Sequence, residues 1–225
     1  QAAEPGEWAV SGAFVFWNHQ GWKGREKGRW LEVHTTLYEN KWLQGMEVCN
    51  GNEYYPDAHQ WCLEKNLTML GNSDSHDPDL RKRSAAGDHR TMTLVFAKTR
   101  TLAAVKEALI EGRTAVWFKD KIIGRKEFLE PLFAECVEVV RSPVWRPKTV
   151  SVQLRNKCDS DIHLKRSGSL GPAQLTLPAG ATSLVHVTVG KTGEPVQLTY
   201  TATNFLIAPD IRLPVVFEVP SGKKE

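Results

Sequence analysis

The chain has 225 residues, of which 41% are hydrophobic and 24% are charged, and its formal net charge is +3. This composition is that of an ordinary globular protein with room for one large or two small domains. The charge is too slight to indicate a nucleic-acid partner, and no apolar stretch approaches the roughly 20 residues of a membrane span. The cysteines show no CxxC spacing, so no zinc knuckle or thioredoxin-like motif is expected among Cys49, Cys62, Cys136 and Cys158.

The first part of the chain reads as short apolar strands that alternate with helices. Apolar runs predict strands at residues 13–17, 46–50 and 67–70. Helices are predicted between them at residues 30–41 and 57–65. The second of these segments follows a proline, which is favoured in the first turn of a helix. This alternation is typical of a βα architecture.

Polar side chains of the kind that bind metals stand where these strands end. His19 follows the first predicted strand, and Asp74 and His76 follow the third. Carboxylate with imidazole is a ligand set suited to zinc, manganese or iron. A turn or helix cap is the alternative for Asp74, and a structural histidine is the alternative for His19. Because three strands in succession end in this way, we favour a metal site. Glu47 and Asn50 are candidates to orient its ligands, and a structural ion pair is the alternative for Glu47.

The next segment continues the alternation of strand and helix. Residues 92–97 predict a strand, and Thr101 is placed to cap a helix that ends at Gly112. Residues 114–118 predict a further strand. An amphipathic pattern over residues 126–140 predicts a helix that Pro131 should kink or divide.

From residue 148 onward the apolar period shifts to two, and helical patterns disappear. Repeated strands separated by turn clusters predict a small antiparallel β-sandwich. We therefore expect an α/β domain over residues 1–141, a linker over residues 142–148 and a β-sandwich over residues 149–220.

The first domain resembles the polymerase and histidinol phosphatase (PHP) family of metal-dependent phosphoesterases. The resemblance covers residues 15–137 and points to a bacterial phosphodiesterase branch with a C-terminal β-sandwich. It rests on the ordered motifs Trp17-Asn18-His19-Gln20-Gly21-Trp22, Gly45-Met46-Glu47-Val48-Cys49-Asn50-Gly51, Gly71-Asn72-Ser73-Asp74-Ser75-His76-Asp77, His89-Arg90-Thr91-Met92-Thr93-Leu94-Val95-Phe96-Ala97 and Gly112-Arg113-Thr114-Ala115-Val116-Trp117.

The resemblance implies the C-terminal part of a distorted (β/α)7 barrel that holds two or three divalent ions, zinc, manganese or iron. It implies that His19, Asp74 and His76 are metal ligands and that the substrate is a small phosphate ester. It also favours a periplasmic or secreted protein. Arg90 is then a candidate to offset charge on the phosphoryl oxygens, and His89 a candidate to protonate the leaving group. A surface salt bridge for Arg90 and a solvated loop for His89 are the alternatives.

The loop after His19 adds residues that could contact an ester. Trp22, together with Tyr54, Tyr55 and Trp61 further along the chain, could line an apolar pocket for the organic group. Lys23 and Arg25 could meet a phosphate. Plain packing for the aromatic side chains and an exposed basic loop are the alternatives.

In one respect the sequence departs from the family's metal-binding site. The family's site begins with a His-x-His motif on its first strand, and nothing upstream of His19 supplies it. We expect the N-terminal half of the barrel to come from the same precursor or from a second chain. A metallohydrolase acting on esters or amides other than phosphates, and a non-catalytic binding or scaffold protein, remain as alternatives.

Overall fold

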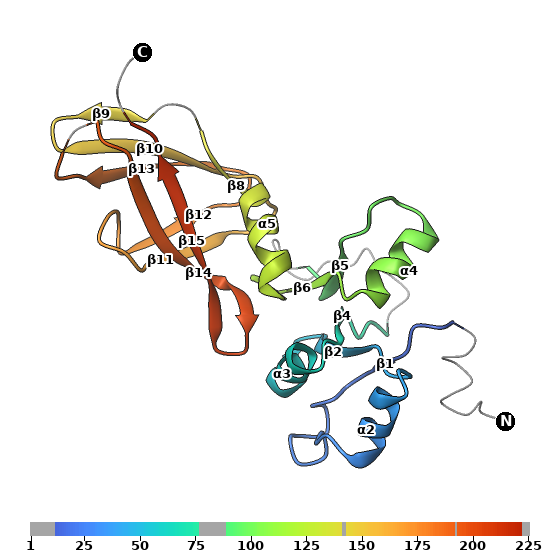
Figure 1. The fold of residues 1–225 in the computed structure, drawn as a ribbon. Helices are drawn as coiled ribbons and strands as arrows, with labels where there is room; N and C mark the ends of the chain where they lie inside the picture. Colours follow the sequence, from blue (N-terminus) through green and yellow to red (C-terminus); the bar gives the residue numbers. More distant parts are fainter. Residues whose placement is uncertain (1–11, 77–88, 141–142, 192, 222–225) are drawn as a thin grey trace. The chain divides into compact units, whose positions relative to one another are not determined.

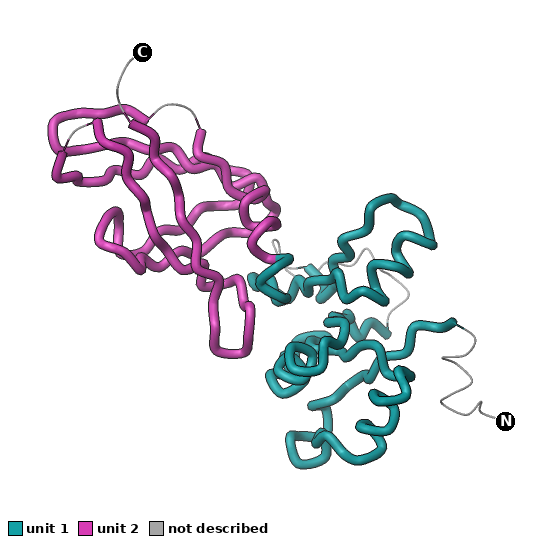
Figure 2. Tube along the Cα trace, in the orientation of Figure 1, with its two compact units in different colours: residues 1–128 teal, residues 129–225 magenta. Residues whose placement is uncertain are grey.

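The computed structural model describes residues 12–76, 89–140, 143–191 and 193–221. The chain divides into two compact units, residues 1–128 (unit 1) and residues 129–225 (unit 2), shown in Figure 2. Unit 1 mixes helices with strands, and unit 2 consists of strands apart from the helix at its start (Figure 1). No helix in the described ranges is long and apolar enough to cross a membrane.

A short parallel sheet forms the centre of unit 1. Strand β2 (Gly45–Asn50) lies between β1 (Phe16–Trp17) and β4 (Thr68–Asn72), and both neighbours run parallel to it. All six residues of β2 are buried, as expected for a parallel strand covered on both faces. A two-residue turn then reverses the chain into β3 (Glu53–Tyr54), which pairs antiparallel with the end of β2.

Two helices connect these strands, as the sequence predicts. Helix α2 (Glu32–Glu39) links β1 to β2, and helix α3 (Pro56–Glu64) leads from β3 towards β4. Pro56 is the first residue of α3, where its missing N–H leaves no hydrogen bond unmade. Helix α3 buries Ala58, His59 and Cys62, whereas α2 has no fully buried residue.

The second half of unit 1 differs from the expected βα pattern. Strands β5 (Met92–Val95), β6 (Thr114–Phe118) and β7 (Lys121–Gly124) are antiparallel, although helix α4 (Leu102–Ile110) separates β5 from β6. The β5–β6 ladder continues beyond the strands through a bond from the Phe96 amide to the Arg113 carbonyl (2.9 Å). The helix is therefore an insertion at the end of a hairpin and makes no crossover over the sheet. Thr101 caps it as predicted.

Close contacts join the two halves of unit 1. A Cβ atom at Gly71 of β4 would overlap the Val116 side chain of β6, so only glycine allows this approach. The Thr114 hydroxyl donates to the Met69 carbonyl (2.7 Å), and the Gly71 amide donates to the Thr93 hydroxyl (2.9 Å). These side chains take the place of a backbone ladder between β4 and the antiparallel strands.

Helix α5 (Lys126–Cys136) contains the boundary between the units and is shorter than predicted. It continues through Pro131, but it ends at Cys136, and the chain then forms strand β8 (Val137–Val139) instead of further helix. Strand β8 pairs with the end of β10 (Thr149–Asn156), which fixes residues that the amphipathic pattern had assigned to the helix.

Unit 2 consists of two antiparallel sheets. One contains β8, β9 (Val144–Arg146), β10 and β13 (Thr182–Thr188). The other contains strands that alternate buried and exposed residues, as expected when one face packs on a core: β11 (Ile162–Arg166), β12 (Gln174–Leu177), β14 (Val196–Ala208) and β15 (Ile211–Val219). The expected linker over residues 142–148 includes β9, which is paired with β10, and the compact unit begins earlier, at Leu129.

A disulfide between Cys136 and Cys158 joins the end of α5 to the turn after β10. The two cysteines are 22 residues apart in sequence. Closing a loop of this length restricts the unfolded chain by about 3 kcal/mol. Disulfides of this kind persist in oxidising compartments such as the periplasm and the extracellular space.

We expect the double variant Cys136→Ala/Cys158→Ala to lower the melting temperature of unit 2 by roughly 10–20 °C, because about 3 kcal/mol is a large fraction of the stability of so small a unit. Scanning calorimetry with and without reductant measures this. The reductant should shift the wild-type transition and leave that of the double variant in place. A wild-type transition that ignores the reductant would contradict the prediction.

Candidate functional site

The parallel strands of unit 1 bring the predicted site residues to one edge of the sheet. His19 lies two residues beyond β1, Asn50 is the last residue of β2, and Asp74 lies two residues beyond β4. Parallel strands place their C-terminal ends at the same edge, which is where α/β proteins bind ligands. The structure therefore brings the ends of the strands that carry His19, Asn50 and Asp74 to the same edge.

His19 is held by a buried carboxylate. Glu47, fully buried on β2, accepts a hydrogen bond from the His19 backbone amide (2.6 Å), and the same oxygen lies 2.9 Å from His19 Nδ1. When Nδ1 carries the proton it donates to this carboxylate, and Nε2 then keeps its lone pair. Nε2 makes no hydrogen bond within the part of the chain that the structure describes. A carboxylate–imidazole pair of this kind orients a histidine for a metal ion.

Two amides complete the surroundings of Glu47. The Asn72 side chain donates to Glu47 Oε1 (2.6 Å), and Asn50 Nδ2 lies 3.0 Å from His19 Nδ1. Asn50 Oδ1 is buried and has no hydrogen-bond partner among the described residues. The sequence prediction included Glu47 and Asn50 but missed Asn72. The signal was available, because Asn72 ends β4 in register with Asn50 at the end of β2.

Asp74 and His76 follow β4 on the exposed side of this edge. Both residues are exposed, and the His76 ring nitrogen Nδ1 lies 2.8 Å from the Asp74 backbone oxygen. Asp74 has a positive φ of 52°, a conformation that aspartate tolerates better than most residues. Its Cβ lies close to Gly51, in the turn that follows Asn50, so the carboxylate starts beside the end of β2.

The start of β5 is tied to the same edge. The Thr91 hydroxyl donates to the Gly51 backbone oxygen (2.7 Å), which brings the backbone of Arg90 near the β2–β3 turn. The His89 ring lies against the Trp117 ring, tilted by 41°, with ring centroids 3.9 Å apart. Both nitrogens of His89 already contact backbone oxygens, Nδ1 that of Arg90 (2.8 Å) and Nε2 that of Lys119 (2.6 Å). This histidine therefore links β5 to the β6–β7 turn in addition to any role in proton transfer.

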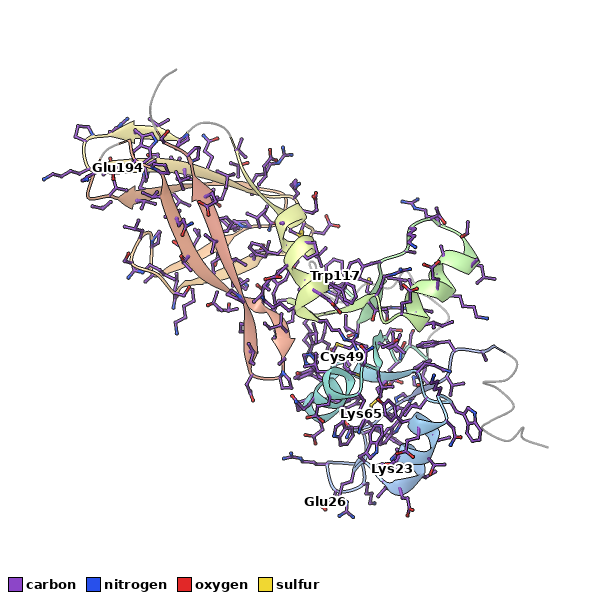
Figure 3. The ribbon with its side chains drawn as sticks, in the orientation of Figure 1. Lys23, Glu26, Cys49, Lys65, Trp117 and Glu194 are labelled. Atoms are coloured by element: carbon purple, nitrogen blue, oxygen red, sulfur yellow. A yellow bond between two sulfur atoms is a disulfide. The ribbon has the colours of Figure 1, made fainter. Side chains whose placement is uncertain are left out.

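The two free cysteines of unit 1 are poor metal ligands. Burial, and after it the charge of Glu47, raises the pKa of the Cys49 thiol far above its usual range. Burial also raises the pKa of Cys62 to about 12. A thiol binds metals as the thiolate, so both residues act as core side chains, and Cys49 is seen inside the sheet in Figure 3.

The donors that remain fit a divalent ion in kind but not in arrangement. Imidazole nitrogens of His19 and His76 and the Asp74 carboxylate suit zinc, manganese or iron. In the described ranges, however, no group of three or more His, Cys, Asp or Glu side chains is arranged to hold a metal ion. This edge of the sheet therefore provides candidate ligands, one of which, His19, contacts Glu47. A complete coordination shell needs further donors.

Comparisons with known proteins agree with this description. The chain is similar to a two-domain protein from Bacteroides vulgatus ATCC 8482, known from its crystal structure, that contains a predicted PHP-like metal-dependent phosphoesterase. The two are 35% identical with a TM-score of 0.87, and the match covers 97% of this chain and 66% of the other. This chain thus spans slightly less than two thirds of that protein's length.

The second unit is matched independently. A family described as an Ig-like domain matches residues 137–218, which confirms the predicted β-sandwich and begins at β8. No sequence among the curated proteins matches the chain.

Proposed function

We propose that this chain carries part of the active site of a metal-dependent phosphoesterase that hydrolyses phosphate esters, phosphodiesters in particular. The observation that carries the proposal is the His19–Glu47 pair, because a buried carboxylate on Nδ1 leaves Nε2 to act as a ligand. The similarity to a protein containing a predicted phosphoesterase of the PHP-like type supports the reaction class.

His19, Asp74 and His76 would hold a divalent ion, which lowers the pKa of water and neutralises phosphate oxygens when bound. Glu47 keeps His19 in the tautomer that binds metal, and Asn72 holds Glu47 in place. Arg90 would lie beside the phosphoryl group and offset the charge that develops on its oxygens, because its guanidinium can make two parallel hydrogen bonds.

The missing ligands are proposed to come from outside this chain. The similar protein is longer, and the described residues provide no complete metal-binding group. We infer that a preceding segment of the same precursor, or a second polypeptide, completes a (β/α)7 barrel and its two or three divalent ions. On this proposal β1 is an internal strand of the complete barrel.

The proposal is tested by comparing Asp74→Ala and Arg90→Ala in the full-length protein. Asp74→Ala should lose metal and activity together, because it removes a ligand. Arg90→Ala should retain its metal content but lower kcat for a diester by roughly 100-fold, as expected when one preorganised donor to developing charge is lost.

Metal content measured by mass spectrometry, and turnover of phosphomonoesters, diesters and carboxyl esters, separate these effects. Arg100→Ala, an exposed arginine in the loop before α4, is the matched control and should change neither quantity. Normal kinetics in Arg90→Ala would refute its role. Full activity of the 225-residue chain alone would refute the proposed second source of ligands.

A further inference from the structure

The loop that follows His19 is held in one shape by its own contacts. Gln20 is buried, and its side chain donates to the Gly28 backbone oxygen (2.6 Å). This hydrogen bond joins the two ends of the loop formed by residues 20–28. Within this loop, the Gly24 backbone oxygen accepts hydrogen bonds from the amides of Lys27 (3.1 Å) and Gly28 (3.0 Å). These bonds fix the backbone without help from the rest of the unit.

A close contact and an ion pair attach this loop to the surrounding structure. A Cβ atom at Gly21 would overlap the Tyr55 ring, whereas one at Gly28 would overlap the Gln20 backbone within the loop. Arg25 meets Asp57 at the start of α3 through two contacts, Nε to Oδ2 (2.9 Å) and Nη2 to Oδ1 (3.2 Å). The loop is therefore a fixed support for the side chains it carries.

The loop of residues 20–28 carries Trp22 with its side chain exposed to solvent. Its side chain is 63% exposed, although burying an indole is among the larger stabilising contributions available to a protein. The Trp22 amide donates to the His19 backbone oxygen (3.3 Å), and the two rings lie 6.3 Å apart. The exposed indole is thus the direct neighbour of the candidate ligand His19.

A cation accompanies the indole. Lys23 Nζ lies 5.3 Å from the centre of the Trp22 ring, and Lys23 is labelled in Figure 3. Leu102 on α4 is more exposed (86%), but its side chain is aliphatic and offers no ring for stacking. A flat apolar face beside a positive charge suits a polar ring better than a flexible acyl chain, because both faces of a ring can stack while its substituents stay solvated.

From this geometry we propose that Trp22 is the platform on which the organic group of the substrate stacks, and that this group contains a ring next to the phosphate. A sugar and a nucleoside share this chemistry. The inference rests on the proposed phosphoesterase function, in which the phosphate lies at His19. Trp22 then determines which esters are accepted, while the metal ligands determine the reaction.

The test measures equilibrium binding of three phosphomonoesters to the full-length protein in the presence of Mn²⁺, by calorimetry and by saturation-transfer NMR. The probes are glucose 6-phosphate, adenosine 5′-monophosphate and glycerol 3-phosphate. One of the two ring-bearing esters should bind about fivefold to tenfold more tightly than the acyclic ester, which is the lower range for stacking on an aromatic side chain. Which of the two does so identifies the ring as sugar or nucleoside.

Trp22→Ala should abolish this preference, and Trp22→Phe should retain most of it. Leu102→Ala removes an even more exposed apolar side chain elsewhere in unit 1 and should change nothing. Equal binding of all three esters, or a preference that survives in Trp22→Ala, overturns the platform and leaves the phosphate site intact. Glucose or adenosine binding as tightly as its phosphate, in a Trp22-dependent manner, supports the platform and contradicts the phosphoesterase proposal. Absence of binding by every probe overturns both.

Discussion

Replacing Arg125 with leucine is expected to destabilise unit 1 by about 3–5 kcal/mol, because it leaves buried carbonyl groups without a donor. Arg125 is 9% exposed, and its guanidinium donates to the backbone oxygens of Leu67 (2.7 Å), Cys62 (3.0 Å) and Gly112 (3.3 Å). Burial lowers its pKa from the usual value. One side chain thus joins the end of α3, the approach to β4 and the turn after α4.

Urea unfolding followed by tryptophan fluorescence measures this effect, since seven of the eight tryptophans lie in residues 1–128. Arg125→Lys keeps the charge but loses the fork of donors, and should fall between wild type and Arg125→Leu. Arg100→Leu changes an exposed arginine and should stay within about 0.5 kcal/mol of wild type. Coincident unfolding curves for Arg125→Leu and wild type would contradict the prediction.

The site edge was predictable because its signals are local. Strands β1, β2 and β4 are short apolar runs, and the polar residues that matter follow each run within a few positions. Parallel strands then bring those positions together without further information. Glu47 could also be recognised from the sequence, since a carboxylate in the middle of an otherwise apolar buried strand needs hydrogen-bond partners.

Elements that depend on distant contacts were missed for physical reasons. The strand–helix–strand pattern of β5, α4 and β6 is the same whether the strands run parallel or antiparallel. The spacing of apolar residues identifies a strand but does not show how it is oriented relative to its neighbour. The end of α5 depends on the pairing of β8 with β10 and on the link from Cys136 to Cys158. Arg125 gave no sequence signal, because its partners are backbone oxygens of helix α3, of the approach to β4 and of the turn after α4.

Glu47→Gln is expected to weaken metal binding by the full-length protein about 10-fold to 100-fold, the usual cost of losing the carboxylate behind a ligating histidine. The carboxylate accepts from the His19 amide and from Asn72, and it lies against His19 Nδ1, so its two oxygens act as acceptors. A glutamine amide in its place directs its own N–H groups at one of these donors. His19 then loses the contact that fixes its tautomer, and its ring turns away from the metal.

Titration with Mn²⁺ or Zn²⁺ by calorimetry measures the affinity, and nitrogen NMR of the His19 ring reports the tautomer independently of activity. Glu53→Gln is the matched control, because Glu53 is an exposed glutamate on the neighbouring strand whose partner is the Tyr55 hydroxyl (2.9 Å). It should leave metal affinity and tautomer unchanged. If Glu47→Gln bound metal as tightly as wild type while His19 kept a protonated Nδ1, then Glu47 would be a structural residue of β2, and His19 would owe its orientation to its backbone alone.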